Sequence, residues 1–168
     1  PEILDSADQI LDQTKRISRI VQSLVSFSHS GTTEVAMEPV YVFECAQEAI
    51  DLLSLNKEVT QVSFTNLADP NHCVKGDQQR LTQVFINLLG NAVKFTPKDG
   101  VVRVRASCEE GWVTVAVEDN GPGIDKQQLE HIFEVFEQAA SHSSTSGTGL
   151  GLAIVQSLMQ LLAGTISV

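Results

Sequence analysis

Two asparagines and a lysine recur at helical spacing in the middle of the chain. Asn87, Asn91 and Lys94 stand at i, i+4 and i+7, which places them on one face of a helix. Asparagine is a mediocre helix former, so two of them one turn apart in an otherwise apolar helix suggest a function. Amide oxygens suit Mg²⁺, and the lysine would meet an anion. A solvated polar face explains this helix, taken alone, equally well.

The segment Asp119-Asn120-Gly121-Pro122-Gly123-Ile124 directly follows a predicted strand. A carboxylate held at a strand end beside a tight turn can accept a hydrogen bond from an exocyclic amine, such as that of adenine. The same residues also favour an ordinary surface turn, so this signal is weak by itself.

A glycine-rich segment, Gly147-Thr148-Gly149-Leu150-Gly151-Leu152, opens the last predicted helix. Glycines let the backbone approach a phosphate closely, and the N–H groups at a helix start supply donors. No lysine follows the glycines, which excludes a P-loop, and the Ser/His-rich segment before them argues against a dinucleotide fingerprint. A flexible linker capped by a helix is the alternative, and Leu150 and Leu152 argue against it.

Two phenylalanines, Phe133 and Phe136, stand three residues apart ahead of a small, polar segment at 139–146. On a short helix they could anchor a mobile lid over a site. Simple core packing is the favoured interpretation when these residues are taken alone.

The elements around these residues are predicted from periodicity. Asp77 is the expected N-cap of a strong helix ending near Phe95, whose core face would consist of Leu81, Phe85, Leu88 and Ala92. Further helices are expected at 44–55 and 150–163. Strands are expected at 40–42, 62–64, around 74, at 101–106 and 112–117 with a turn at 109–111 between these two, and at 165–168.

The first segment, 1 to about 28, has the pattern of one long helix. Its seam positions alternate steps of four and three, as in a heptad repeat, and are apolar except for Thr14 and Ser28: Ile3, Ala7, Ile10, Thr14, Ile17, Val21, Leu24 and Ser28. Flanking apolar residues widen this stripe, which suits a helix bundle better than a two-stranded coil. A helix lying on its own domain is the alternative.

Composition limits the partners that can be expected. The chain of 168 residues is 42% apolar and carries a formal net charge of −10, so it can form a core and has no general attraction for nucleic acid or anionic membranes. Cys45, Cys73 and Cys108 show no CxxC spacing and are predicted to be buried free thiols in a reducing compartment. No apolar run reaches the length of a membrane span, and we expect a soluble segment with no direct membrane contact.

The order and spacing of the four motifs resemble those of sensor histidine kinases. The segment from Asn87 to Thr96 looks like their N box, Asp119 to Ile124 like their first glycine box, Phe133 to Phe136 like their F box, and Gly147 to Leu152 like their second glycine box. The resemblance covers roughly residue 39 to the C-terminus. The heptad segment is similar to the second helix of the family's dimerisation domain, which gives expected domains of 1–31 and 32–168.

The resemblance implies an α/β fold of the Bergerat type, in which helices cover one face of a mixed sheet, preceded by one long bundle-forming helix. The implied reaction is transfer of the γ-phosphoryl group of ATP to a histidine, with Mg²⁺ as the metal. Homodimerisation through the first helix, a response-regulator receiver domain as partner, and a cytoplasmic location are implied as well, with the parent protein possibly anchored in the inner membrane.

The resemblance also implies a role for each matched residue. Asp119 would recognise the adenine amine, Asn91 would hold Mg²⁺, and Asn87 would stand beside the metal and phosphates. Lys94 would reach a phosphate and Phe95 would line the pocket. The glycine boxes would form the adenine-side loop and the phosphate cradle, with Gly121, Gly123 and Ile124 in the first and Gly147, Thr148, Gly149, Leu150, Gly151 and Leu152 in the second.

The sequence departs from the family pattern in three places. No His is followed by an acidic residue on a first dimerisation helix, and His29, before Ser30 and Gly31, is interpreted as a surface residue. Gln138 stands where many members carry an arginine. The family usually has one more strand after the position of Val168, so we expect the chain to be a fragment.

Two other functions compete with the kinase. ATPases of the gyrase, chaperone and mismatch-repair branch place a glutamate base where Asn87 stands, and an amide cannot take a proton from water. A degenerate pseudokinase acting as a dimeric scaffold is disfavoured by the intact motifs.

Overall fold

The computed structural model describes residues 37–56, 61–134 and 149–168. The predicted dimerisation helix, Phe136, Gln138, Gly147 and Thr148 lie outside these ranges, as does the segment predicted to be a lid. Predictions about them therefore stay predictions.

Five strands form two sheets in the described part of the chain. Strand β1 (Glu38–Tyr41) pairs antiparallel with β3 (Cys73–Gly76). The second sheet has the order β2-β4-β5 and is mixed, because β2 (Ser63–Asn66) runs parallel to β4 (Val101–Glu109), whereas β5 (Trp112–Asp119) runs antiparallel to it. The strands were predicted near these positions.

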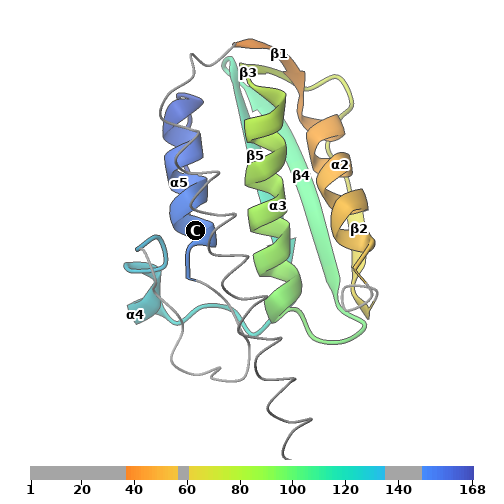
Figure 1. Cartoon of the computed structure of the whole chain (residues 1–168), viewed down its shortest axis with the longest axis vertical. Coiled ribbons are helices and arrows are strands. Elements are labelled where there is room, and N and C mark those ends of the chain that lie inside the picture. Colours follow the sequence, from red (N-terminus) through yellow and green to blue (C-terminus); the bar gives the residue numbers. More distant parts are fainter. Residues whose placement is uncertain (1–36, 57–60, 135–148) are drawn as a thin grey trace, which may run out of the picture.

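Three helices lie side by side over one face of the second sheet (Figure 1). Helix α3 (Gln78–Phe95) is central, with α2 (Val42–Ser54) on one flank and α5 (Gly151–Leu161) on the other. A single turn, α4 (Lys126–Leu129), follows the first glycine loop. The predicted sandwich with helices on one face is confirmed. None of the described helices is long and apolar enough to cross a membrane.

Helices α3 and α2 begin with different kinds of cap. At α3, the Asp77 carboxylate accepts a hydrogen bond from the Arg80 N–H at 2.8 Å, as predicted for an N-cap. At α2 no side chain caps the helix, and the Val42 N–H instead donates to the carbonyl of His72 at 3.0 Å. The start of α2 is therefore fixed by a partner far away in the sequence, and the pattern placed it two residues too late.

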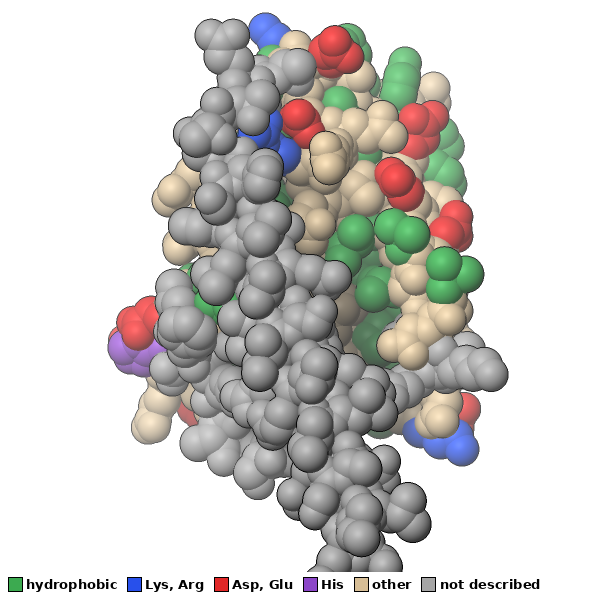
Figure 2. Space-filling view, viewed as in Figure 1, with side chains coloured by type: hydrophobic (Ala, Val, Ile, Leu, Met, Phe, Trp, Pro, Cys, Tyr) green, Lys and Arg blue, Asp and Glu red, His purple; other side chains and the backbone are tan. Residues whose placement is uncertain are grey.

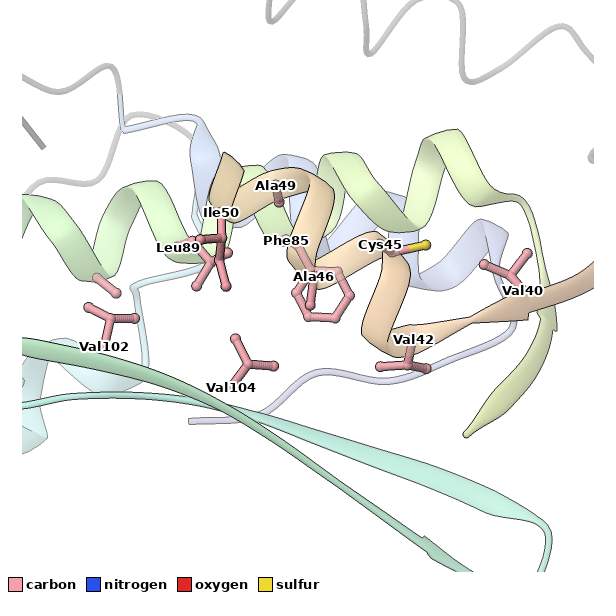
Figure 3. Packing of buried hydrophobic residues seen from close by; sticks show 11 residues of the cluster. Val40, Val42, Cys45, Ala46, Ala49, Ile50, Phe85, Leu89, Val102 and Val104 are labelled. Carbon is pink, nitrogen blue, oxygen red and sulfur yellow. The ribbon is translucent and has the colours of Figure 1, made fainter. Parts of the chain in front are cut away.

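The larger apolar cluster fills the space between α2, α3 and the sheet (Figure 3). Phe85 and Leu89 point from α3 toward Val102 and Val104 of β4, and all four are at most 1% exposed. We call this group the sheet cluster; its buried members are Val40, Val42, Cys45, Ala46, Ala49, Ile50, Phe85, Leu89, Ala92, Val102 and Val104. Alternate residues of β5 pack against it, so the sheet cluster supports the strand that ends at Asp119.

A smaller apolar cluster joins α3 to α5. Its buried members are Val84, Leu150, Ile154, Val155 and Leu158, and we call it the α5 cluster. Leu88 packs against this group. The predicted core face of α3 was therefore partly wrong: Phe85 and Ala92 are buried in the sheet cluster, whereas Leu88 faces α5 because α3 has apolar neighbours on two sides.

Three other predictions are corrected by the structure. Of the three cysteines only Cys45 is buried. Cys73 is exposed because it alternates with the inward residues of β3. Cys108 shares the face of Val102 and Val104 but lies at the end of β4, where its neighbours are exposed as well. Residues 165–168 do not form a strand. The β4–β5 turn is shorter than predicted, since Glu109 pairs with Trp112 and leaves only Glu110 and Gly111 between the strands.

Candidate nucleotide site

The predicted metal-binding face of α3 lies in its C-terminal half. Asn87, Asn91 and Lys94 are each partly buried there. The amide nitrogen of Asn87 donates to the backbone carbonyl of Gln83 at 3.0 Å. Because the nitrogen is engaged, the amide oxygen remains to accept a donor or coordinate a cation.

Asn91 lies against the first residue of α5. A Cβ added at Gly151 would lie 3.4 Å from the amide nitrogen of Asn91 and 3.5 Å from its oxygen. The Asn91 amide therefore faces the backbone of the second glycine motif, although the two residues are 60 positions apart in the sequence. The packing of α5 on α3 brings these two predicted site residues together.

The start of α5 has the features of an anion-binding helix end. Gly149 has φ of 66°, a left-handed conformation that glycine adopts without strain, and Leu150 is buried in the α5 cluster. Leu150, at the N-cap position, provides no side-chain hydrogen bond to the helix start. The N–H groups of a first helical turn point out of the helix end, where they can bind an anion. Leu152 is partly buried in the same turn.

Lys94 carries its charge in a partly desolvated position. Its ammonium lies 4.8 Å from the centre of the Phe95 ring. Burial lowers the pKa of Lys94 below the usual lysine value. A cation in such a place would be stabilised by a nearby anion more than one in open water.

The first glycine loop meets the end of α3. The Asp119 carboxylate accepts a hydrogen bond from the Gly121 N–H at 2.8 Å. A Cβ added at Gly121 would lie 2.8 Å from the backbone oxygen of Phe95, so no larger residue fits without a shift. Gly123 has φ of 78°. The loop that carries Asp119 is therefore packed against the same helix end as Lys94.

Several predicted site residues are not brought into this group by the contacts found. Ile124 is 46% exposed, and Phe133 is partly buried in the turns that follow α4. Phe136, Gly147 and Thr148 lie outside the described residues.

Sequence reasoning missed the structural role of Asn120, next to Asp119. The side-chain oxygen of Asn120 accepts from the Val101 N–H at 2.8 Å, and it lies where a Cβ at Gly100 would approach to 2.7 Å. Asn120 was interpreted only as a turn former. Its partner is 19 residues away, which local spacing cannot show.

A hollow away from these residues lies beside α2. A shallow hollow of about 500 Å³ lies on the outer face of α2, beside Phe43, Gln47 and Leu52. Figure 2 shows acidic and apolar side chains gathered on this side of the molecule. None of the predicted site residues lines it. Within the described residues, no three His, Cys, Asp or Glu side chains gather to hold a metal.

Comparison with known families agrees with this arrangement. Residues 76–168 match the family described as histidine kinase-, DNA gyrase B-, and HSP90-like ATPase. The match covers more than half of the chain and includes α3, both glycine motifs and α5. The chain therefore belongs to this family of ATP-binding domains.

Individual relatives indicate which branch of this family the chain resembles. Histidine protein kinase DivJ of Caulobacter vibrioides is 36% identical over 123 residues, which are 72% of this chain and 21% of that protein. The solved structure of a mycobacterial sensor histidine kinase, MprB, superposes with a TM-score of 0.66 at 30% identity, covering 76% of this chain and 80% of that one. Full-length ShkA in complex with AMPPNP gives 0.73 at 29% identity, covering 90% of this chain and 32% of that one.

These relatives support the assignment of the chain as the catalytic ATP-binding domain of a sensor histidine kinase, as predicted from the sequence. The chain spans only 17–32% of the length of the first three curated relatives.

Proposed function

We propose that this chain binds ATP with Mg²⁺ at the C-terminal half of α3 and presents the γ-phosphoryl group to a histidine for relay to a receiver domain. One observation carries the proposal: both glycine motifs meet the same end of one helix. Gly151 abuts Asn91, and Gly121 abuts Phe95.

Each end of the nucleotide has a matching group. Asp119, exposed at the end of β5, would accept a hydrogen bond from the adenine amine. The N–H groups at the start of α5 and the ammonium of Lys94 would hold the phosphates. Phe95 would line the pocket between them.

A magnesium ion fits the amide face of α3. Mg²⁺ prefers oxygen ligands and usually keeps waters and substrate phosphates in its shell, so one or two protein oxygens suffice. Asn91 would supply one, and the free oxygen of Asn87 would lie beside the metal and the phosphates. When bound, the ion would neutralise charge on the transferred group.

Phosphoryl transfer asks this chain mainly for position and charge. Asn87 and Lys94 would hold the triphosphate in line with an incoming imidazole, and most of the rate would come from this arrangement. Asn87 cannot act as a general base toward water, because its amide has no basic lone pair near neutral pH. We therefore favour transfer to histidine over the hydrolysis performed by other branches of the family.

The remaining partners are proposed from the kinase relatives. Residues 1–31 would form the second helix of a dimerisation domain, through which two copies of the chain would associate, and residues 32–168 would form the catalytic domain. The domain would act in the cytoplasm, where ATP and receiver domains are available.

The test is phosphotransfer to an acceptor supplied separately. The chain is mixed with a histidine-kinase dimerisation domain, γ-labelled ATP and Mg²⁺, and acid-labile, alkali-stable label on the acceptor is measured. We expect label on the acceptor and none on a His→Gln control of that acceptor. Release of phosphate without transfer, abolished by Asn87→Ala, would instead establish an ATPase.

A further inference from the structure

Asp119 can recognise a base only if the strand end that carries it is held still. Its carboxylate is exposed, and the Gly121 N–H bond is local to the turn. Something outside the turn must therefore fix the turn against the rest of the domain.

The β4–β5 ladder ends at the pair Val102 and Asp119. One step further, the Val101 N–H donates to the side-chain oxygen of Asn120 at 2.8 Å. The side chain thus replaces the next rung of the ladder, which frees the backbone of Asn120 to turn away toward Gly121.

The loop between α3 and β4, next to this hydrogen bond, is tightly packed around Gly100. A Cβ at Gly100 would lie 2.3 Å from Cγ2 of Thr96 and 2.7 Å from the Asn120 oxygen. The Gly100 N–H donates to the carbonyl of Pro97 at 2.9 Å, and its own carbonyl accepts from Ser63 at 2.9 Å. The loop between α3 and β4 is therefore fixed by packing and hydrogen bonds, and Asn120 is held against it.

Resting on the proposed role of Asp119, we propose that Asn120 is a positioning residue for purine recognition. It ties the turn after Asp119 to the start of β4 and so sets where the Asp119 carboxylate points. Asn120 itself need not touch the nucleotide.

The experiment compares ATP with inosine triphosphate, which carries an oxygen where ATP has the exocyclic amine. Affinities of both nucleotides are measured calorimetrically for the wild-type chain, Asn120→Ala and Asn120→Asp. Asn120→Asp keeps an acceptor oxygen at the same reach, and the repulsion between its added charge and the triphosphate acts on both nucleotides alike.

We expect Asn120→Ala to reduce the preference for ATP by about threefold to tenfold, the effect of about one hydrogen bond. Affinity for inosine triphosphate should hardly change, and Asn120→Asp should keep the wild-type ratio. Equal weakening of both nucleotides in Asn120→Ala, or loss of the preference in Asn120→Asp, would overturn the proposal in favour of a merely structural role.

A second measurement separates this proposal from the proposed function. Exchange of the Val101 amide hydrogen, followed by NMR without nucleotide, should accelerate in Asn120→Ala and stay slow in Asn120→Asp. Unchanged exchange in Asn120→Ala would contradict the tie itself. A wild-type chain that binds both nucleotides equally would contradict the adenine role of Asp119, and the inference would fall with it.

Discussion

The two apolar clusters on either side of α3 differ in how many helices and strands contribute buried residues to them. The sheet cluster draws buried residues from β1, α2, α3 and β4. The α5 cluster has five buried residues, of which only Val84 belongs to α3 and the rest lie in or next to α5. The proposed base end of the site rests on the first, and the proposed phosphate end on the second. Among the described residues, the buried apolar contacts of α5 are made to one other helix, whereas the sheet cluster joins four elements. Fewer buried contacts favour local opening, so we expect the phosphate end to be the more adjustable one.

The largest expected effect compares the same substitution in the two clusters. Leu89 is 0% exposed in the sheet cluster and Leu158 is 4% exposed in the α5 cluster. Leu89→Ala should lower the free energy of unfolding by about 2–5 kcal/mol, because it leaves a cavity in the braced core. Leu158→Ala should have a smaller global effect and mainly accelerate amide exchange in α5.

Denaturant unfolding and native-state hydrogen exchange measure these two quantities. If Leu158→Ala accelerated exchange in α3 and the sheet as much as in α5, the two clusters would be one cooperative unit and the comparison would fail.

The base end can be tested without disturbing either cluster. Asp119→Asn keeps one oxygen that can accept from the Gly121 N–H, and replaces the other acceptor oxygen and the charge by an NH2 donor. ATP affinity should fall by about 10- to 150-fold, the range for a charged hydrogen bond, with an unchanged melting temperature. Unaltered affinity measured by calorimetry would remove Asp119 from the site.

Gly→Ala should change the free energy of unfolding in opposite directions at two glycines. A Cβ at Gly90, in the middle of α3, would meet nothing within 4 Å, whereas at Gly100 it would clash with Thr96. Without nucleotide, Gly90→Ala should raise the free energy of unfolding by about 0.5–1 kcal/mol, because alanine is the better helix former. Gly100→Ala should lower it by about 1–3 kcal/mol through overpacking. Thermal denaturation of both variants gives the signs, and a stabilised Gly100→Ala would show that the base end is not tightly packed.

The smallest effect lies in a turn remote from both ends. Backbone and side-chain hydrogen bonds from Asn71 hold the pKa of Asp69 below its usual value of 3.8. Its folded pKa is depressed, so its contribution to stability is present above 3.8 and is lost as the pH falls through the folded value. Asp69→Ala should slightly lower the free energy of unfolding at neutral pH and leave it unchanged at a pH below the folded pKa of Asp69. Denaturant unfolding at neutral pH and at that acidic pH checks this, and an equal loss at both would contradict it.

Periodicity and capping predicted most of the elements. Asp77 caps α3 as expected, because an N-cap depends on residues within one turn. The start of α2 was missed because the carbonyl of His72, and no local side chain, receives its first N–H. Leu88 was placed on one core face with Phe85 and Ala92, yet it packs against the α5 cluster, because helical spacing does not show which neighbour covers each residue.

The candidate site was predicted from motif types rather than from contacts. Spacing placed Asn87, Asn91 and Lys94 on one face, and α3 bears this out. No sequence pattern showed that Gly151 would abut Asn91 or that Asn120 would complete the β4–β5 ladder. Both depend on how distant elements pack, which the two clusters decide.

The central claim is that the amide face of α3 binds Mg²⁺ together with ATP. Its most direct test is calorimetric titration of ATP, with and without Mg²⁺, into the wild-type chain and Asn91→Ala. We predict that Mg²⁺ strengthens ATP binding to the wild type, and that Asn91→Ala loses this gain while keeping its metal-free affinity. Equal losses with and without the metal, or no effect of Mg²⁺ on the wild type, would contradict the account.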